Sequence, residues 1–224
     1  MKETYLPNHQ DIKVYSGEGM IGINTDTTLL GEFIEVYKND TVLDMGTNTG
    51  ALLLYASLYH PKKLIGIDIN TEALEYAKKN MEENHITNYE LINEDIINYK
   101  NEEVDVIICN PPYFKTKEDN KSNIESLNLA KHESSLNLEN LIPSIRRNLK
   151  NNGTLFMLFQ TSRMQELFNE LSKNKFRIKE IKMCYDENKE YSNVFMVKAV
   201  KGGSYGLISR KPVVIKRWKI TFKV

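Results

Sequence analysis

The segment VLDMGTNTG, from Val42 to Gly50, decides the fold. Its first four residues, Val42–Met45, have the composition of a buried strand and run into a turn of small residues. The next stretch, ALLLYASL at Ala51–Leu58, has the composition of a buried helix. A strand that enters a helix through a tight, glycine-containing turn is typical of a parallel βαβ unit.

The same alternation continues along the chain. We expect helices at Thr71–Asn84, Leu138–Leu149 and Arg163–Leu171, the second of which ends before the stop signal Asn151–Gly153. We expect strands at Leu64–Ile69, Glu90–Ile92, Val104–Cys109 and Thr154–Phe159. A closing pair of strands is expected at Phe176–Tyr185 and Asn193–Val200. Asn70 stands where an N-cap belongs. The sequence predicts a Rossmann-like α/β fold: a mostly parallel, seven-stranded sheet with an antiparallel C-terminal hairpin. We expect one domain over residues 1–203, in which 1–40 flank cofactor and substrate, and a basic tail over 204–224.

Composition limits the alternatives. The chain has 224 residues, 41% of them hydrophobic, which suffices for one sizeable core, and its zero net charge indicates no particular partner. Cys109 and Cys184 form no disulfide framework or zinc pattern, and the histidines lack metal-ligand spacing. No apolar run is long enough to cross a bilayer. We therefore expect a soluble, cytoplasmic protein without metal or membrane, and we favour a monomer.

Acidic residues are expected at the carboxyl ends of successive strands, where open α/β sheets bind ligands. Asp44 opens a loop in which Gly46, Asn48 and Gly50 favour a tight turn, since Asn tolerates positive φ better than most residues. Asp68 can accept both hydroxyls of a ribose, and Asp95 suits an adenine amino group. A plain turn at the loop, or a capping role for either aspartate, is the alternative. A nicotinamide cofactor also stays possible on these residues alone.

The fourth strand is followed by Asn110-Pro111-Pro112-Tyr113. Two prolines hold the chain rigidly extended, and the simplest alternative is that they merely end the strand. The nitrogen of an adenine amino group or a carboxamide is a poor nucleophile because its lone pair is delocalised. The Asn carbonyl and a backbone carbonyl can accept its two N–H groups, while the Tyr ring stacks on the planar substrate. Such an arrangement suits methyl transfer to the nitrogen. A sulfonium methyl donor carries its own leaving group, so neither a metal nor a protein nucleophile is required.

Together, the loop, the two later aspartates and this Asn-Pro-Pro-Tyr motif resemble class I amino-methyltransferases. Three further stretches narrow the resemblance. Asn24–Gly31 (NTDTTLLG) resembles a TDxxLLG segment, Leu129–Glu133 (LAKHE) resembles AxxRHE, and Val197–Gly203 (VKAVKGG) resembles a final strand with its Lys-Gly-Gly exit. From Asp26 to Gly203 the chain resembles the bacterial tRNA1(Val) N6-methyltransferase family, which methylates the adenine beside the anticodon.

The resemblance implies S-adenosylmethionine as cofactor and tRNA, at position 37 of tRNA1(Val), as substrate. It places the cofactor ribose at Asp68, its adenine between Asp95 and Ile96, and its methionine end near Asp26 and Thr27. The implied cofactor-binding residues are Asp26, Thr27, Asp44, Gly46, Asn48, Gly50, Asp68, Ile69, Asp95, Ile96 and Asn110, and the implied catalytic residues are Asn110, Pro111, Pro112 and Tyr113. Two features depart from the family: Lys131 replaces an arginine, and the tail after Gly203 is unlike the usual ending.

Basic residues gather where RNA could bind. No Asp or Glu follows Tyr191, so the C-terminal segment is strongly basic, although a solvated lysine-rich tail would look the same. The expected RNA-binding residues are Tyr113, Lys115, Lys131, His132, Arg210, Lys211, Lys216, Arg217 and Lys219. His132 and Glu133 could form an acid–base pair, but we favour a role in organising their loop.

Rival functions follow from the same motifs. Protein N5-glutamine methyltransferases and DNA adenine methyltransferases share the Asn-Pro-Pro-Tyr motif. Glutamine methylation is disfavoured because no separate domain for recognising a protein substrate is apparent in so short a chain. A non-catalytic RNA-binding protein is a remoter rival, and a dehydrogenase is remoter still.

Overall fold

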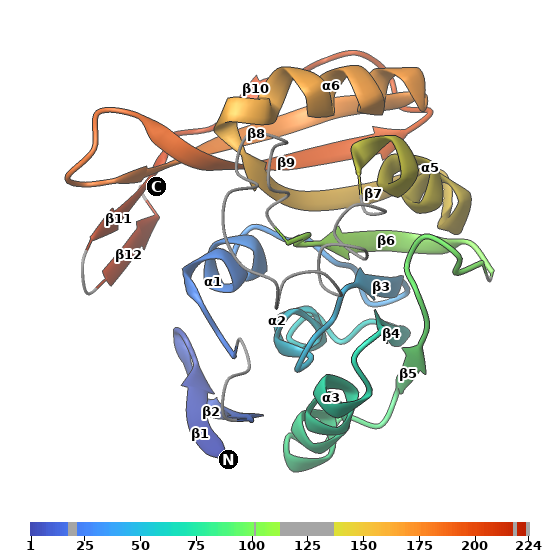
Figure 1. Cartoon of the computed structure of the whole chain (residues 1–224), viewed down its shortest axis with the longest axis vertical. Helices are drawn as coiled ribbons and strands as arrows, with labels where there is room; N and C mark the ends of the chain where they lie inside the picture. Colours follow the sequence, from blue (N-terminus) through green and yellow to red (C-terminus); the bar gives the residue numbers. More distant parts are fainter. Residues whose placement is uncertain (18–21, 101, 113–136, 217–218, 223–224) are drawn as a thin grey trace, which may run out of the picture.

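The strands form one large mixed sheet in the computed structural model, which describes residues 1–17, 22–100, 102–112, 137–216 and 219–222 (Figure 1). The strands of this sheet lie in the order β12-β11-β8-β9-β7-β6-β3-β4-β5, and β10 pairs with β8. Their bounds are β3 Thr41–Met45, β4 Lys63–Asp68, β5 Tyr89–Asn93, β6 Val104–Cys109, β7 Leu149–Gln160, β8 Phe176–Asp186, β9 Ser192–Lys201, β10 Ile208–Ser209, β11 Val213–Lys216 and β12 Lys219–Phe222.

Helices cover both faces of the sheet and bury a separate apolar cluster on each (Figure 1). On one face lie α1 (Thr25–Gly31), α2 (Ala51–Ser57) and α3 (Thr71–Glu83), together with a hairpin of β1 (Lys2–Leu6) and β2 (His9–Ser16). On the other lie α5 (Leu138–Asn148) and α6 (Met164–Lys173), which the 3₁₀ turn Thr161–Arg163 precedes. The expected doubly wound architecture is confirmed.

The start of α3 follows from local chemistry. The side chain of Asn70 accepts hydrogen bonds from the backbone N–H groups of Glu72 (3.0 Å) and Ala73 (3.2 Å), as an N-cap does. Leu74, Ala77 and Met81 are buried on one face. The predicted helix is therefore present and ends one residue earlier than expected.

The prediction of seven strands was too low. The seven core strands are present, and β9 runs antiparallel to both β7 and β8, as the predicted C-terminal hairpin requires. However, β10 and β11 pair in parallel with β8, and β12 pairs with β11. An edge strand leaves a row of N–H and C=O groups unpaired, and the described part of the tail supplies partners for that row.

The start of β7 was also placed too late. The sequence predicts this strand over Thr154–Phe159, but it begins five residues earlier, at Leu149, which pairs with Val104. Asn152 has a φ of +63°. The turn-forming residues Asn151–Gly153 therefore form an irregular part of the strand, rather than a loop before it.

Candidate active site

The strand order changes direction at β3. The chain passes from β3 to β4 and β5 on one side, and then returns to place β6 on the other side of β3. Ligands of doubly wound sheets bind at such a point, in the crevice outside the carboxyl ends of the strands. The loop after β3 and the segment after β6 both lie at this edge (Figure 1).

The loop after β3 adopts the strained conformation that its composition predicts. Gly46, Asn48 and Gly50 have φ values of +84°, +49° and +78°. The departure from glycine at Asn48 is therefore compatible with the turn, because Asn enters the left-handed region at low cost. Gly46 is exposed, and a side chain built there would meet no atom within 4 Å. This open surface lets a ligand lie directly against the backbone.

Asp44 is fully buried, and within the described chain neither of its carboxylate oxygens has a hydrogen-bond partner. Burial raises the pKa of Asp44 to about 7; the nearby Thr47 hydroxyl opposes this shift without reaching hydrogen-bonding geometry, and the Asp68 carboxylate adds to it. A buried, unpaired carboxylate is costly unless a cation or donor accompanies it. The ammonium group of S-adenosylmethionine is such a partner, so this site fits the cofactor.

Thr47 is a residue that the sequence-based site omits. Its hydroxyl is also buried without a hydrogen-bond partner in the described chain, next to Asp44. The position of Thr47 inside a glycine-containing loop was the sequence signal that could have placed it in the cofactor site.

Asp68 ends β4 and braces the loop. Its Oδ2 accepts the N–H of Asn48 at 2.8 Å, and its Oδ1 accepts the N–H of Asn70 at 2.9 Å. Each carboxylate oxygen can accept a second bond, so the group keeps capacity for two ribose hydroxyls. The next residue, Ile69, has a half-exposed side chain, and this placement is compatible with cofactor contact.

Asp95 does not end the third strand, because β5 stops at Asn93. Asp95 Oδ1 accepts the N–H of Ile97 at 2.8 Å, so the carboxylate forms a local turn, which was the alternative interpretation. The side chain of Ile96 is buried in the cluster beneath α5 and α6, which favours its backbone over its side chain for any contact with an adenine. Recognition of adenine by this pair stays a prediction.

Asn110 follows β6 directly, beside the cofactor loop. Cys109 pairs with Met45, and these are the last residues of two strands that lie about 4.8 Å apart. The chain therefore leaves β6 at Asn110 beside the point where it leaves β3 at Gly46. Asn110 is half-buried, and Pro111 is buried. Four predicted site residues of the adjoining loop, Tyr113, Lys115, Lys131 and His132, lie outside the described residues, as does Arg217 of the tail.

The expected methionine-end segment forms α1. Asn24 caps this helix by accepting the N–H of Thr27 at 2.8 Å, and Thr27 is buried while Asp26 is half-buried. Burial, together with the Asp26 carboxylate, raises the pKa of Cys184 to about 12, which places Asp26 near the carboxyl-terminal part of β8.

The described part of the basic tail reaches the same edge of the sheet. Because β11 runs parallel to β8, its last residue, Lys216, lies at the edge where β6 ends. Four strand spacings separate β11 from β6, or about 19 Å. Lys219 begins the next strand, β12. The Nε of Arg210 lies 3.1 Å from a carboxylate oxygen of Glu180, and Lys211 is exposed.

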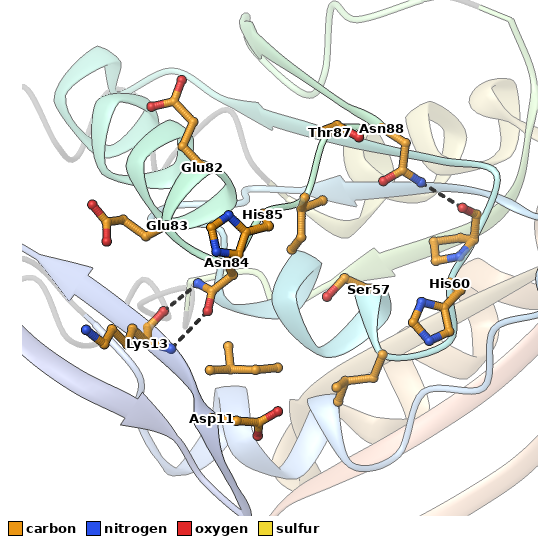
Figure 2. Close-up of a pocket in the computed structure, with 14 residues that line it drawn as sticks. Asp11, Lys13, Ser57, His60, Glu82, Glu83, Asn84, His85, Thr87 and Asn88 are labelled. Carbon is orange, nitrogen blue, oxygen red and sulfur yellow. Dashed lines mark hydrogen bonds between the residues drawn. The ribbon is translucent and has the colours of Figure 1, made fainter.

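A cavity of about 1090 Å³ lies at the opposite edge of the sheet (Figure 2). Its walls include His60, just beyond α2, and Glu82, Glu83 and His85 at the end of α3. None of the site residues that the sequence predicts lines this cavity. It is separate from the candidate active site.

The described residues contain no helix that is long and apolar enough to span a membrane. They also contain no group of three or more His, Cys, Asp or Glu side chains arranged for a metal ion.

Residues 37–206 match the methyltransferase domain family. The chain belongs to this family. Its fold agrees with a predicted O-methyltransferase from Agrobacterium tumefaciens, at a TM-score of 0.67 and 18% identity over 89% of this chain and 92% of that one. It also agrees with a putative methyltransferase from Streptococcus mutans in complex with SAH, at a TM-score of 0.52 and 18% identity over 80% and 99% of the two chains. The methyltransferase domain that the sequence predicts, with S-adenosylmethionine as its cofactor, is confirmed.

Two curated relatives match shorter segments. A putative protein N5-glutamine methyltransferase of Methanocaldococcus jannaschii is 40% identical over 60 residues, 27% of this chain and 30% of that protein. A tRNA1(Val) (adenine(37)-N6)-methyltransferase of Dyadobacter fermentans is 34% identical over 97 residues, 42% of this chain and 39% of that protein. The matched segments span under two fifths of either relative, so they do not by themselves define the substrate.

We expect Asp68→Asn to weaken binding of S-adenosylhomocysteine about tenfold, measured by isothermal titration calorimetry. Asparagine has one acceptor oxygen instead of two, so it cannot serve both the loop amides and the ribose hydroxyls, and hydrogen bonds to a charged acceptor are worth about 1.5–3 kcal/mol. Asp11→Asn, at an exposed carboxylate on β2, is the control and should bind as the wild type does. Unchanged affinity of Asp68→Asn would remove this residue from the cofactor site.

Proposed function

We propose that this methyltransferase transfers a methyl group from S-adenosylmethionine to N6 of an adenine in tRNA, at position 37 of tRNA1(Val). The observation that carries the proposal is the position of Asn110 and Pro111, directly after β6 and beside Gly46 of the cofactor loop. The similarity to the Dyadobacter fermentans tRNA methyltransferase supports the choice of substrate.

The reaction requires alignment more than acid–base chemistry. When bound, S-adenosylmethionine supplies an electrophilic methyl on a positively charged sulfur. The Asn110 side-chain carbonyl and the neighbouring backbone carbonyl accept the two N–H groups of the adenine amine. This pulls the nitrogen toward tetrahedral geometry, directs its lone pair at the methyl, and stabilises the positive charge that develops on it. The prolines limit the freedom of the Asn110 backbone, so the acceptor is already in place before the substrate binds.

The cofactor loop fixes the other reactant. The Asp44 carboxylate and the Thr47 hydroxyl, both without partners in the described chain, would hold the amino acid end of the cofactor, and Asp68, which braces the loop, would hold its ribose. The proton that leaves the methylated nitrogen is acidic once the nitrogen is cationic, so water suffices as its acceptor.

An RNA loop is the favoured context for the target base. Turning a base out of a duplex costs a few kcal/mol and costs less from a single-stranded loop, which favours an anticodon loop over DNA. The β11–β12 hairpin supports this choice because its basic residue Lys216 lies at the catalytic edge, about 19 Å from β6. Phosphates several nucleotides along the RNA from a bound base can reach such a distance.

Protein N5-glutamine methylation is the second candidate, and the Methanocaldococcus jannaschii relative favours it. A glutamine carboxamide presents the same geometry to Asn110 as an adenine amine, so the two reactions share one mechanism and differ in the surface that delivers the substrate.

Methyl transfer into separate pools of tRNA, DNA and protein distinguishes adenine methylation from glutamine methylation. Radiolabelled S-adenosylmethionine is supplied with tRNA, DNA and protein from cells that lack this gene, and nucleosides are then analysed by mass spectrometry. We expect label in tRNA as N6-methyladenosine, and little or none in tRNA from which the target isoacceptor has been removed. Label confined to protein would replace the tRNA proposal by glutamine methylation, and indiscriminate labelling of tRNA would contradict the assignment to one isoacceptor.

A further inference from the structure

Asn80 on α3 and Asn84, the residue that caps the end of this helix, bind the free edge of β2. The N–H of Tyr15 donates to Asn80 Oδ1 at 2.7 Å, and Asn80 Nδ2 donates to the Tyr15 carbonyl at 3.0 Å. One helical turn later, Asn84 makes the same two bonds with Lys13, at 3.0 and 2.8 Å (Figure 2). The spacings agree, because four helical residues rise about 6 Å and two strand residues about 6.8 Å. The two side-chain amides therefore take the place of a partner strand.

The two amides pair with backbone groups of β2 that face away from β1. Along an antiparallel strand, alternate residues direct their N–H and C=O groups away from the partner strand. In β2 these are Lys13 and Tyr15, because both direct these groups at α3. A two-stranded hairpin is marginally stable alone, so its docking on α3 depends on these contacts and on the apolar residues beneath it.

Asn80 differs from Asn84 in one bond, and that bond leads to the cofactor loop. Asn80 Nδ2 also donates to the carbonyl of Thr49 at 2.8 Å, whereas the further bond of Asn84 returns to the Asn80 carbonyl within its own helix. Asn80 is fully buried, and Thr49 is 1% exposed. Removal of the amide therefore takes a partner away from backbone groups that bulk water does not reach.

The Thr49 carbonyl belongs to the tight turn of the loop, between the positive φ angles of Asn48 and Gly50. On its other side, Asn80 holds β2, whose chain continues toward Asn24 and the start of α1, the segment expected at the methionine end of the cofactor. One buried amide thus contacts both the cofactor loop and the strand that precedes the expected methionine-end segment.

We infer that Asn80 is a positioning residue for the cofactor, which couples docking of the N-terminal hairpin to the binding geometry of the Asp44–Gly50 loop. The inference concerns cofactor binding and does not depend on which substrate is methylated.

Comparison of Asn80→Ala with Asn84→Ala tests the coupling, because both variants lose the same pair of bonds to β2 and only the first also loses the bond to the loop. Calorimetry with S-adenosylhomocysteine should give about tenfold weaker binding for Asn80→Ala and a change within twofold for Asn84→Ala. The KM for S-adenosylmethionine should rise in Asn80→Ala more than kcat falls. Equal losses in both variants would reduce Asn80 to a structural residue, and unchanged affinity in Asn80→Ala would overturn the inference directly.

Hydrogen exchange of the unaltered chain gives a second test, which stands even if Asn80→Ala does not fold. Saturation with S-adenosylhomocysteine should slow amide exchange both in residues 47–50 and in residues 12–16, by about tenfold in each. The same protection of residues 12–16 should persist in Asn84→Ala. Protection that stops at the loop, with residues 12–16 unchanged, would show that the loop and the hairpin are not coupled.

Discussion

Replacement of Asn110 by alanine is expected to lower kcat about thousandfold while S-adenosylhomocysteine binds within twofold of its wild-type affinity. The side-chain carbonyl of Asn110 acts on the amino group of the substrate, and loss of one preorganised polar group of this kind costs about 10²–10³ in kcat. The cofactor loop keeps its own contacts, because Asp68 and Ile67 hold it without Asn110. Single-turnover methyl transfer and calorimetry measure the two quantities separately.

The variant Asn110→Asp tests whether the acceptor oxygen of this side chain is the feature that matters for turnover. A carboxylate keeps the acceptor oxygen but adds a charge, so this variant should lose about tenfold in kcat, far less than Asn110→Ala. Asn39→Ala, at an exposed residue between α1 and β3, should behave as the wild type. Retained turnover in Asn110→Ala would remove Asn110 from the reaction while leaving the methyltransferase fold and its cofactor intact.

Local signals predicted those parts of the site that depend on the backbone of one segment. The apolar run of β6 ends at Cys109 in both prediction and structure, so Asn110 was placed correctly at the sheet edge. The left-handed conformation of Asn48 follows from its residue type and its glycine neighbours. Asn70 forms the expected cap because its side chain bonds only to the next helical turn. None of these features requires a distant partner.

Features that depend on distant partners were missed. The β1–β2 hairpin is short and half-exposed, so its alternation is weak, and it docks through contacts with Asn80 of α3 and with Asn84, which caps that helix. An asparagine is unfavourable inside a helix, so Asn80 was a signal of this contact. The pairing of β11 with β8 is likewise set by an edge strand that lies far back in the chain. At Asp95 the carboxylate also forms a local turn, while its expected cofactor role stays a prediction.

Asp44→Asn is expected to weaken S-adenosylhomocysteine binding about 30- to 100-fold while making the free protein more stable at pH 8. The first effect follows because the buried carboxylate provides the charge that faces the ammonium group, and a charge-assisted bond is worth about 1.5–3 kcal/mol. The second follows because a neutral amide avoids the cost of burying a charge. The exposed variant Asp11→Asn should show neither effect.

The pH dependence of both effects has a defined sign. The pKa of Asp44 is about 7 in the folded chain against an ordinary value of 3.8, so between these values the folded state holds a proton that the unfolded state has lost. The free energy of unfolding of the wild type therefore falls as pH rises from about 4 to 7, by an amount on the order of a few kcal/mol. Asp44→Asn lacks this fall, so its stability advantage in urea denaturation should be near zero at pH 4 and fully developed at pH 8.

Conversely, wild-type affinity for S-adenosylhomocysteine should decline as pH drops below 7 and this carboxylate is protonated, whereas the variant should show no such decline. Equal stability of the two proteins at pH 8 would contradict a buried, unpaired carboxylate in the free enzyme. A gain in stability without loss of affinity would instead place the ammonium group of the cofactor away from Asp44.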